Sequence, residues 1–150
     1  TINNEPQWGS HSNESVVFNN YYTYNDTTHV FDFYALFANS IIWGEYKQEF
    51  GVDTAPTDQV KFEYLFDHCL MKLEKKYNIS DETRFKSIIN SVDSLPRFKN
   101  PVRYNSRLDT LSPSKDKGLI DYSNYIQLDL DGNDRLTDGK PDLGAFERFE

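Results

Sequence analysis

Hydrophobic residues recur at every second position along residues 60–67, where Val60, Phe62, Tyr64 and Phe66 fall on one side. A period of two is typical of a strand, because its successive side chains point to opposite faces. Shorter apolar runs occur at residues 16–18, 40–43, 69–71 and 87–89, separated by loops rich in Asn, Asp, Ser and Thr. The pattern therefore predicts an all-β chain of short strands.

Helical periodicity is scarce along the chain. Residues 81–86 are the one stretch that predicts a short helix, with Ser80 or Asp81 as its N-cap.

A short internal repeat indicates how the strands are arranged. Residues 37–42 (FANSII) resemble residues 66–71 (FDHCLM), and residues 85–89 (FKSII) repeat the pattern one residue short. Residues 18–22 (FNNYY) repeat it loosely. Spacings of 19 to 29 residues between the Phe positions suit the coils of a β-solenoid, although a β-sandwich with similar strands is an alternative. His68 takes the position of Asn39, so we expect its side chain at a turn of a coil.

Composition narrows the class of protein. The net charge of −8 argues against nucleic acid as a partner, and no apolar run reaches the roughly 18 residues that cross a bilayer. The single cysteine, Cys69, lies among apolar residues and is expected to be a buried, unreactive thiol. The chain starts without Met or a signal pattern, so we expect either that a leader was removed or that a much larger N-terminal part is missing.

The charges are spread unevenly. Residues 1–46 contain no Lys or Arg, whereas residues 84–107 contain six basic residues and one acid. A solvated surface is one explanation of this basic run, and an anion-binding strip is the other. The candidate ligand-binding residues of the strip are Arg84, Lys86, Arg97, Lys99, Arg103 and Arg107.

Three motifs near the C-terminus follow one another in order: residues 111–118 (LSPSKDKG), 128–135 (LDLDGNDR) and 141–147 (PDLGAFE). Together they resemble the ending of bacterial right-handed parallel β-helix proteins of the pectate-lyase-like superfamily. Residues 39–44 (NSIIWG) and 93–98 (DSLPRF) are similar to further elements of those proteins. The resemblance implies a right-handed parallel β-helix, with coils over residues 1–107 and a last coil with its capping segment over residues 108–150.

In this interpretation the C-terminal motifs close the last coil, whose strand edges must be covered. Arg135 is expected to pair with Asp142 or Glu147, and Phe146 and Phe149 to plug the apolar end. The predicted cap residues are Asp131, Gly132, Arg135, Asp142, Gly144, Phe146 and Glu147.

The same region carries a calcium-like spacing. Asp129, Asp131, Gly132 and Asp138 fall at positions that resemble those of an EF-hand loop. However, Gln127 stands where the first Asp is usual, and the predicted cap explains these residues without an ion. A Ca²⁺ site at Asp129, Asp131 and Asp138 is therefore an alternative, and otherwise no cofactor is expected.

The resemblance implies a bacterial protein that is secreted, periplasmic or displayed on the cell surface, for example as a lipoprotein. The leading hypothesis is a non-catalytic structural and binding section that meets polysaccharide, with sugar rings stacking on Tyr21, Tyr22, Tyr24, Trp8 or Trp43. The alternative is a carbohydrate lyase or glycoside hydrolase whose cleft is completed by missing N-terminal coils. Those coils, or a second copy of the chain, are the expected protein partners.

Overall fold

The computed structural model describes residues 1–4, 13–55, 57, 59–91 and 94–149. These residues form short strands and two very short helices, so the prediction of an all-β chain is confirmed. The strands are β1 (Ile2–Asn4), β2 (Val16–Asn19), β3 (Tyr21–Tyr24), β4 (Thr27–Val30), β5 (Phe33–Gly44), β6 (Phe50–Asp53), β7 (Phe62–Met71), β8 (Phe85–Asn90), β9 (Phe98–Asn100) and β10 (Asn105–Leu108). The helices are the 3₁₀ helix η1 (Pro101–Arg103) and the α-helix α1 (Ile120–Ser123).

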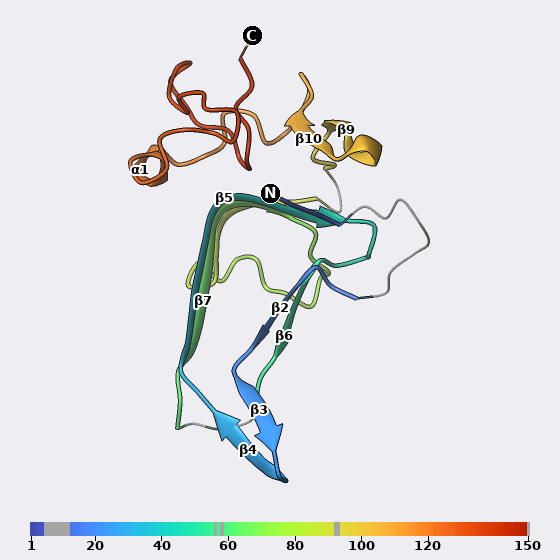
Figure 1. The fold of residues 1–150 in the computed structure, drawn as a ribbon, viewed down its shortest axis with the longest axis vertical. Coiled ribbons are helices and arrows are strands. Elements are labelled where there is room, and N and C mark those ends of the chain that lie inside the picture. The colour runs from blue at the N-terminus through green and yellow to red at the C-terminus, as the bar shows by residue number, and fades with distance from the viewer. Residues whose placement is uncertain (5–12, 56, 58, 92–93, 150) are drawn as a thin grey trace.

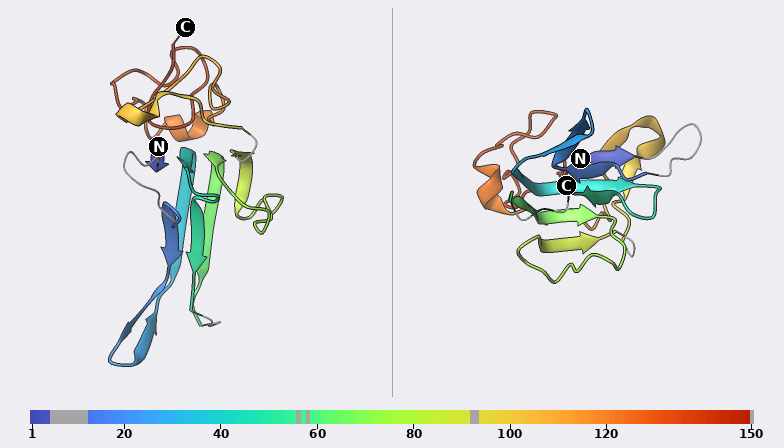
Figure 2. Two further views of the ribbon diagram at one scale, coloured as in Figure 1. Left: turned by 90° about the vertical axis from the view of Figure 1, so that its right-hand side faces the viewer. Right: turned by 90° about the horizontal axis from the view of Figure 1, so that it is seen from below.

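Four strands form a sheet in which every neighbouring pair is parallel. Their order is β1-β5-β7-β8, so the strands are added side by side in chain order, as the right-hand view of Figure 2 shows. Strands β2 and β6 also pair in parallel, and they follow β1 and β5 along the chain. Two antiparallel pairs, β3–β4 and β9–β10, complete the pairing of the named strands.

The predicted internal repeat coincides with the strand register. Phe37 pairs with Phe66, and Phe66 pairs with Phe85. Asn39, His68 and Ser87 fall between paired rows and all have positive φ, which bends each strand at the same point. His68 therefore lies at a bend within β7, at the same position as the bends of the neighbouring strands.

Two details of the predicted repeat are wrong. The third copy is not one residue short, because Ile88 pairs with Cys69 and Asn90 pairs with Met71. The loose copy at residues 18–22 is not equivalent to the others, since Phe18 lies in β2 and pairs with Val52 of β6. A pattern of one Phe and a few polar residues does not distinguish strands of different sheets.

Aromatic side chains fill the space between the four-stranded sheet and the β2–β6 pair. Phe66, which is fully buried, stacks on Phe18 at 5.8 Å and on Phe85 at 5.9 Å between ring centroids. The ring of Phe50 meets that of Phe66 edge-on at 4.9 Å. Burial of each such side chain contributes roughly 1.5–3 kcal/mol, so this cluster is the main stabilising element of residues 13–91.

A C-terminal segment, residues 94–149, lies across the outer face of the four-stranded sheet (Figure 1). Ile41 and Leu70 point out of the sheet and pack against Phe98, Leu108 and Leu143 of this segment. Because Phe98 and β9–β10 belong to this layer, it begins before residue 108, the predicted boundary.

The segment therefore covers a lateral face, and the prediction that it closes the edge of the last coil is wrong. The predicted apolar plug is also wrong, because Phe149 is exposed and Phe146 packs against Arg107, whereas buried Leu143 fills the contact with the sheet.

The predicted helix at residues 81–86 is wrong, because β8 already begins at Phe85. Asp81 instead organises a single turn: its carboxylate accepts hydrogen bonds from the amide and hydroxyl of Thr83. Among the described residues the α-helix is α1, a four-residue turn that no apolar period marks. Among the described residues, no helix has the length and apolar content needed to cross a membrane.

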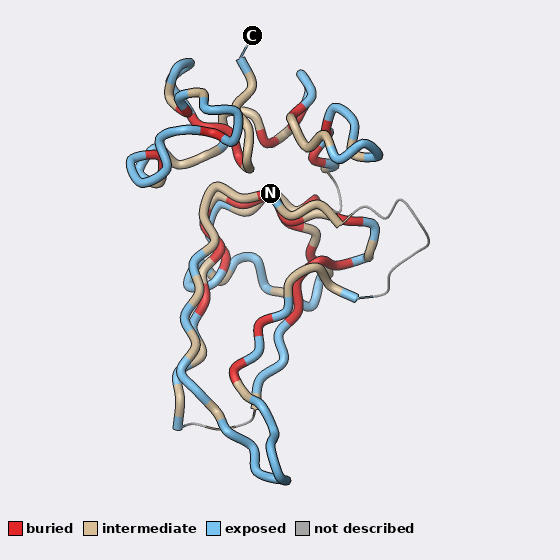
Figure 3. Tube along the Cα trace, in the orientation of Figure 1, coloured by how far each residue is buried: buried red, intermediate tan, exposed pale blue. Residues whose placement is uncertain are grey.

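The hairpin β3–β4 projects away from the rest of the molecule, at the opposite end from the C-terminal segment (Figure 1). Almost every residue of the hairpin is exposed, as Figure 3 shows. Its turn residues, Asn25 and Asp26, both have positive φ, which is what a tight two-residue hairpin turn requires.

Candidate functional site

The six basic residues predicted as one anion-binding strip are divided between two places. Arg84 and Lys86 lie at the start of β8. The other four lie in β9, η1 and β10 or, for Arg97, directly before β9. Lys86 Nζ lies 3.5 Å from Asp67 Oδ2, and Arg107 donates two hydrogen bonds to Asp131, from Nε at 2.8 Å and Nη2 at 2.5 Å. Part of the basic charge is therefore neutralised within the fold.

The predicted calcium ligands make hydrogen bonds and ion pairs within the chain. Both carboxylate oxygens of Asp129 accept N–H groups, from Asp131 and Asn133 on Oδ1 and from Asn133 and Glu147 on Oδ2. Asp131 pairs with Arg107, as described above. Among the residues that the structure describes, no three His, Cys, Asp or Glu side chains are grouped so as to hold a metal ion. These contacts account for Asp129 and Asp131 without an ion, and calcium binding stays a prediction.

The pKa of Asp129 reflects these contacts. Burial acts to raise it, but the N–H groups of Glu147 and Asn133 stabilise the carboxylate more strongly, so the net pKa lies below its usual value. The ionised carboxylate of Asp129 thus holds its loop in place through these hydrogen bonds.

The predicted pair between Arg135 and Glu147 is confirmed. Arg135 Nη1 lies 2.6 Å from Glu147 Oε1, and Nη2 donates to the carbonyl of Gly144 at 3.1 Å. The second oxygen of Glu147 accepts the amide of Asp142, so the predicted alternative partner is linked indirectly. Burial raises the pKa of Glu147 to about 7 and also raises the pKa of Asp142.

Two predicted glycines have clear backbone roles. Gly132 has φ +84°, which a turn permits most easily with glycine. Gly144 has φ +98°, and a Cβ atom there would lie 2.5 Å from Thr1 Oγ1 and 3.0 Å from Ile41 Cδ1. Gly144 therefore allows the C-terminal segment to approach β5, where its amide donates to the carbonyl of Asn39.

A polar cluster joins the sheet to the C-terminal segment around Asp67. This side chain is almost fully buried, and its carboxylate accepts hydrogen bonds from His68 Nδ1 at 2.6 Å and the Tyr122 hydroxyl at 2.9 Å. Burial acts to raise the pKa of Asp67, but His68, Tyr122 and Lys86 together lower it below its usual value. Burial and the bond to Asp67 raise the pKa of Tyr122 to about 12.

A cavity of about 640 Å³ lies between the outer face of β5 and helix α1. Its lining is mostly apolar and includes Leu36, Tyr125 and Ile126, all strongly exposed. The hydroxyl of Ser123, which also lines the cavity and is buried, has no hydrogen-bond partner among the described residues. The cavity is of the size and character of small-molecule sites.

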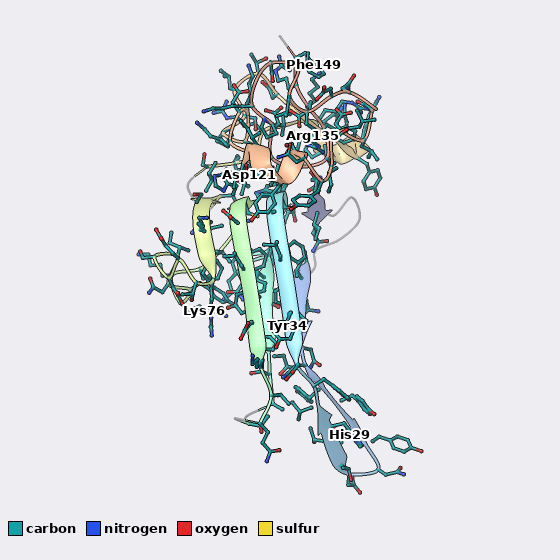
Figure 4. All side chains as sticks on the ribbon, turned by 90° about the vertical axis from the view of Figure 1, so that its left-hand side faces the viewer. His29, Tyr34, Lys76, Asp121, Arg135 and Phe149 are labelled. Carbon is teal, nitrogen blue, oxygen red and sulfur yellow. The ribbon has the colours of Figure 1, made fainter. Side chains whose placement is uncertain are left out.

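A group of exposed aromatic side chains lies on and next to the β3–β4 hairpin and at the start of β5. It consists of Tyr22, Tyr24, His29 and Phe31 on or next to the hairpin and Tyr34 on the outer face of β5. Tyr22 stacks on His29 at 4.9 Å and on Phe31 at 5.7 Å, and yet Tyr22 and Phe31 are 53% and 51% exposed. Figure 4 labels His29 on the hairpin and Tyr34 on β5. We call these five residues the aromatic surface.

Sequence reasoning identified part of this surface. Tyr22 and Tyr24 were predicted to stack on sugars and are exposed, whereas Tyr21 is half-buried and donates its hydroxyl to Asp53. Trp43 is half-buried against Phe98, and Trp8 lies outside the described residues. The contribution of Phe31 and Tyr34 was missed, since only the strand register shows which aromatics point outward.

Comparison with protein-family models, with curated proteins and with solved structures found no match. The class that the structure itself defines is an all-β chain with a parallel four-stranded sheet.

Proposed function

We propose that this chain is a section of a right-handed parallel β-helix protein of the pectate-lyase-like superfamily. Three features support the proposal. Strands β1, β5, β7 and β8 pair in parallel in chain order, and β2 and β6, which follow β1 and β5 along the chain, form a second parallel pair. The bends of β5, β7 and β8 also align, at residues 39, 68 and 87. Parallel strands stacked in this way are the arrangement of a β-helix, in which each turn of the chain lies on the preceding one. The C-terminal motifs described above resemble this superfamily.

In this proposal the protein is bacterial and is exported or displayed on the cell surface. Further coils of the same protein, or a second copy of the chain, pair with the outer strands β1 or β8, which are the two ends of the sheet order. Light scattering over a range of concentrations tests the second copy, since a strictly monomeric chain excludes it.

The function that we propose is binding of polysaccharide through the aromatic surface. The observation that carries the proposal is that Tyr22, Phe31 and Tyr34 are each more than half exposed, whereas other aromatic side chains of this region are buried in the cluster around Phe66. Aromatic rings in such positions offer apolar faces and, in tyrosine, a polar end, which suits the C–H face and hydroxyl groups of a sugar. Leu36, two positions after Tyr34 in β5, lines the apolar cavity together with Tyr125.

A panel of neutral and acidic polysaccharides, tested by affinity electrophoresis, examines this function. We expect retardation by at least one glycan, and we expect Tyr22→Ala combined with Phe31→Ala to weaken it about tenfold or more. Each lost aromatic contact is worth roughly 0.5–1.5 kcal/mol beyond the buried area.

The matched control for this experiment is Tyr104→Asn. It removes an exposed tyrosine outside the aromatic surface and keeps a residue that tolerates the positive φ at that position. No retardation by any glycan, or equal loss in the control, contradicts the proposal.

A further inference from the structure

The three aligned bends of the parallel sheet have different surroundings. Asn39, on β5, is held by the C-terminal segment: its Nδ2 donates to the carbonyl of Leu119 at 2.9 Å, and its Oδ1 accepts the Leu119 amide at 2.8 Å. His68 and Ser87, at the same position on β7 and β8, instead line a cavity of about 560 Å³. Residues 116–121 form the facing wall of this cavity.

The imidazole of His68 is fixed in one orientation. Its Nδ1–H donates to Asp67 Oδ1 at 2.6 Å, and Asp67 in turn is held by the Tyr122 hydroxyl at 2.9 Å and by Lys86 at 3.5 Å. A carboxylate that occupies Nδ1 leaves Nε2 as the basic atom of the neutral ring. Asp67 is almost fully buried, so this orientation is protected from water.

Ser87 is the neighbour of His68 on the next strand. The rows on either side of the two residues are paired, Asp67 with Lys86 and Cys69 with Ile88, so their backbones lie about 4.8 Å apart. Ser87 is exposed, has φ +53°, and its hydroxyl makes no hydrogen bond to any described residue. The Ser87 side chain therefore lines the same cavity as an imidazole that a buried carboxylate orients, and the two side chains are not hydrogen-bonded to each other in this structure.

We propose that this cavity hydrolyses esters, with Ser87 as nucleophile, His68 as general base and Asp67 as the residue that positions His68. The combination of a hydroxyl, an imidazole and an orienting carboxylate is the arrangement that activates serine for acyl transfer. Its substrate class is a short-chain ester, such as the O-acetyl group of a sugar. The activity goes beyond glycan binding and does not depend on it.

The chemistry balances as an ordinary hydrolysis. Ser87 Oγ bonds to the ester carbonyl carbon while His68 Nε2 takes the hydroxyl proton, and the tetrahedral intermediate then expels the alcohol, which receives that proton. A water molecule, deprotonated by His68, attacks the acyl-serine and releases the carboxylic acid and free Ser87. Lys117 and Lys140 also line the cavity, and they are the cations available to stabilise the oxyanion.

Labelling with a fluorophosphonate probe, followed by peptide mass spectrometry, tests the proposal on the full chain. We expect one phosphonyl adduct on the peptide that contains Ser87, together with hydrolysis of p-nitrophenyl acetate above the rate of buffer. Ser87→Gly abolishes the adduct, and glycine is chosen because it accepts the positive φ. Ser80→Ala, which changes an exposed serine outside the cavity, leaves the adduct unchanged.

His68→Asn tests the base with little risk to the fold, because Asn39 takes the same backbone position on β5. We expect it to slow labelling about 100-fold or more while the Tm stays close to that of the unchanged chain. Asp67→Asn slows labelling less, about tenfold, and Asp67→Glu restores part of the rate, which a purely structural role would not do. An adduct on another residue, no adduct at all, or an unchanged rate in His68→Asn overturns the proposal.

Discussion

The parallel-strand region, residues 13–91, and the C-terminal segment, residues 94–149, are stabilised in different ways. In the first region the backbone is paired strand to strand, and large aromatic side chains form one continuous cluster. The second has only two strands of three and four residues, the 3₁₀ helix η1 and the four-residue helix α1. Its loops are held by side chains that bond to backbone groups. Asp129 and Asp142 alone accept five of the amide groups of this segment.

This difference shows what each kind of sequence can specify. A repeated apolar pattern tolerates changes in single residues as long as the stacked positions stay large and apolar. A polar network depends on each donor and acceptor, because a buried group that loses its partner bears the full cost of its desolvation. In the strands we therefore expect the loss of stability to follow the side-chain volume that a substitution removes. In the C-terminal segment we expect it to depend on whether a buried group loses its hydrogen-bond partner.

The largest effect is expected at the centre of the aromatic cluster. Phe66→Ala should lower the free energy of unfolding by about 4 kcal/mol, since it removes a fully buried ring that stacks on Phe18 and Phe85. Phe66→Leu should cost less than half as much. Urea denaturation followed by tyrosine fluorescence measures both, and equal losses would contradict a cluster that depends on volume.

The next largest effect is expected at the buried ion pair of the C-terminal segment. Arg135→Met should cost about 3 kcal/mol, because it leaves Glu147 and the carbonyl of Gly144 without their partner. Adding Glu147→Gln should recover part of the loss. Amide hydrogen exchange should become faster in the C-terminal segment, whereas the amides of β7 should stay protected. Exchange that rises equally in β7 would show that the two regions unfold as one.

The acid–base behaviour of the two buried carboxyls in the segment gives a third prediction. A pKa that is higher in the folded chain means that the folded chain binds the proton more tightly, so stability falls as the pH rises from about 4.5 to about 7. The change for Glu147 should be on the order of 2 kcal/mol, and Glu147→Gln should flatten it. Thermal melts across this range measure the slope.

A second pH window has the opposite sign. The pKa values of Asp67 and Asp129 lie below the usual 3.8, so their contribution is complete above that pH and is lost as the pH falls further. A melt that shows rising stability between pH 4.5 and 7, with no effect of Glu147→Gln, would contradict the assignment for Glu147.

The smallest effect is expected where the two regions meet. Asn39→Gly keeps the positive φ but removes both hydrogen bonds to Leu119, and it should cost about 1 kcal/mol. The matched change Ser87→Gly removes no hydrogen bond within the described residues and should cost less. A larger loss of stability for Ser87→Gly than for Asn39→Gly would contradict the conclusion that Asn39 is the bend residue that holds the C-terminal segment.

The two regions also differ in how far the sequence alone predicted them. The alternation at residues 60–67 and the likeness of residues 37–42 to 66–71 predicted both the strands and their alignment, because inward positions of stacked strands demand the same kind of side chain. The placement of the C-terminal segment was not predicted. Ile41 and Leu70 are as apolar as their inward neighbours Ile42 and Met71, so the sequence does not show that a second layer covers them.

The sites follow the same division. The pair Arg135–Glu147 was predicted because the two residues lie in neighbouring motifs of the same C-terminal series, only twelve positions apart. The contact of Asp67 with Tyr122 spans 55 positions and joins two regions, and no local pattern indicates it. The basic run from Arg84 to Arg107 looked continuous in sequence, but its members are divided between β8 and the elements β9, η1 and β10 of the C-terminal segment.

The measurement that tests the account most directly is cross-linking of the parallel register. Tyr34 and Glu63 are exposed and paired on β5 and β7, so their Cα atoms lie about 4.8 Å apart, within the range that a disulfide bridges. In a Cys69→Ser background, Tyr34→Cys with Glu63→Cys should oxidise rapidly and without loss of Tm. The control, Tyr34→Cys with Ile79→Cys, should not. Rapid bridging of the control, or none in the paired variant, would contradict the stacked parallel strands on which the fold and both proposed sites depend.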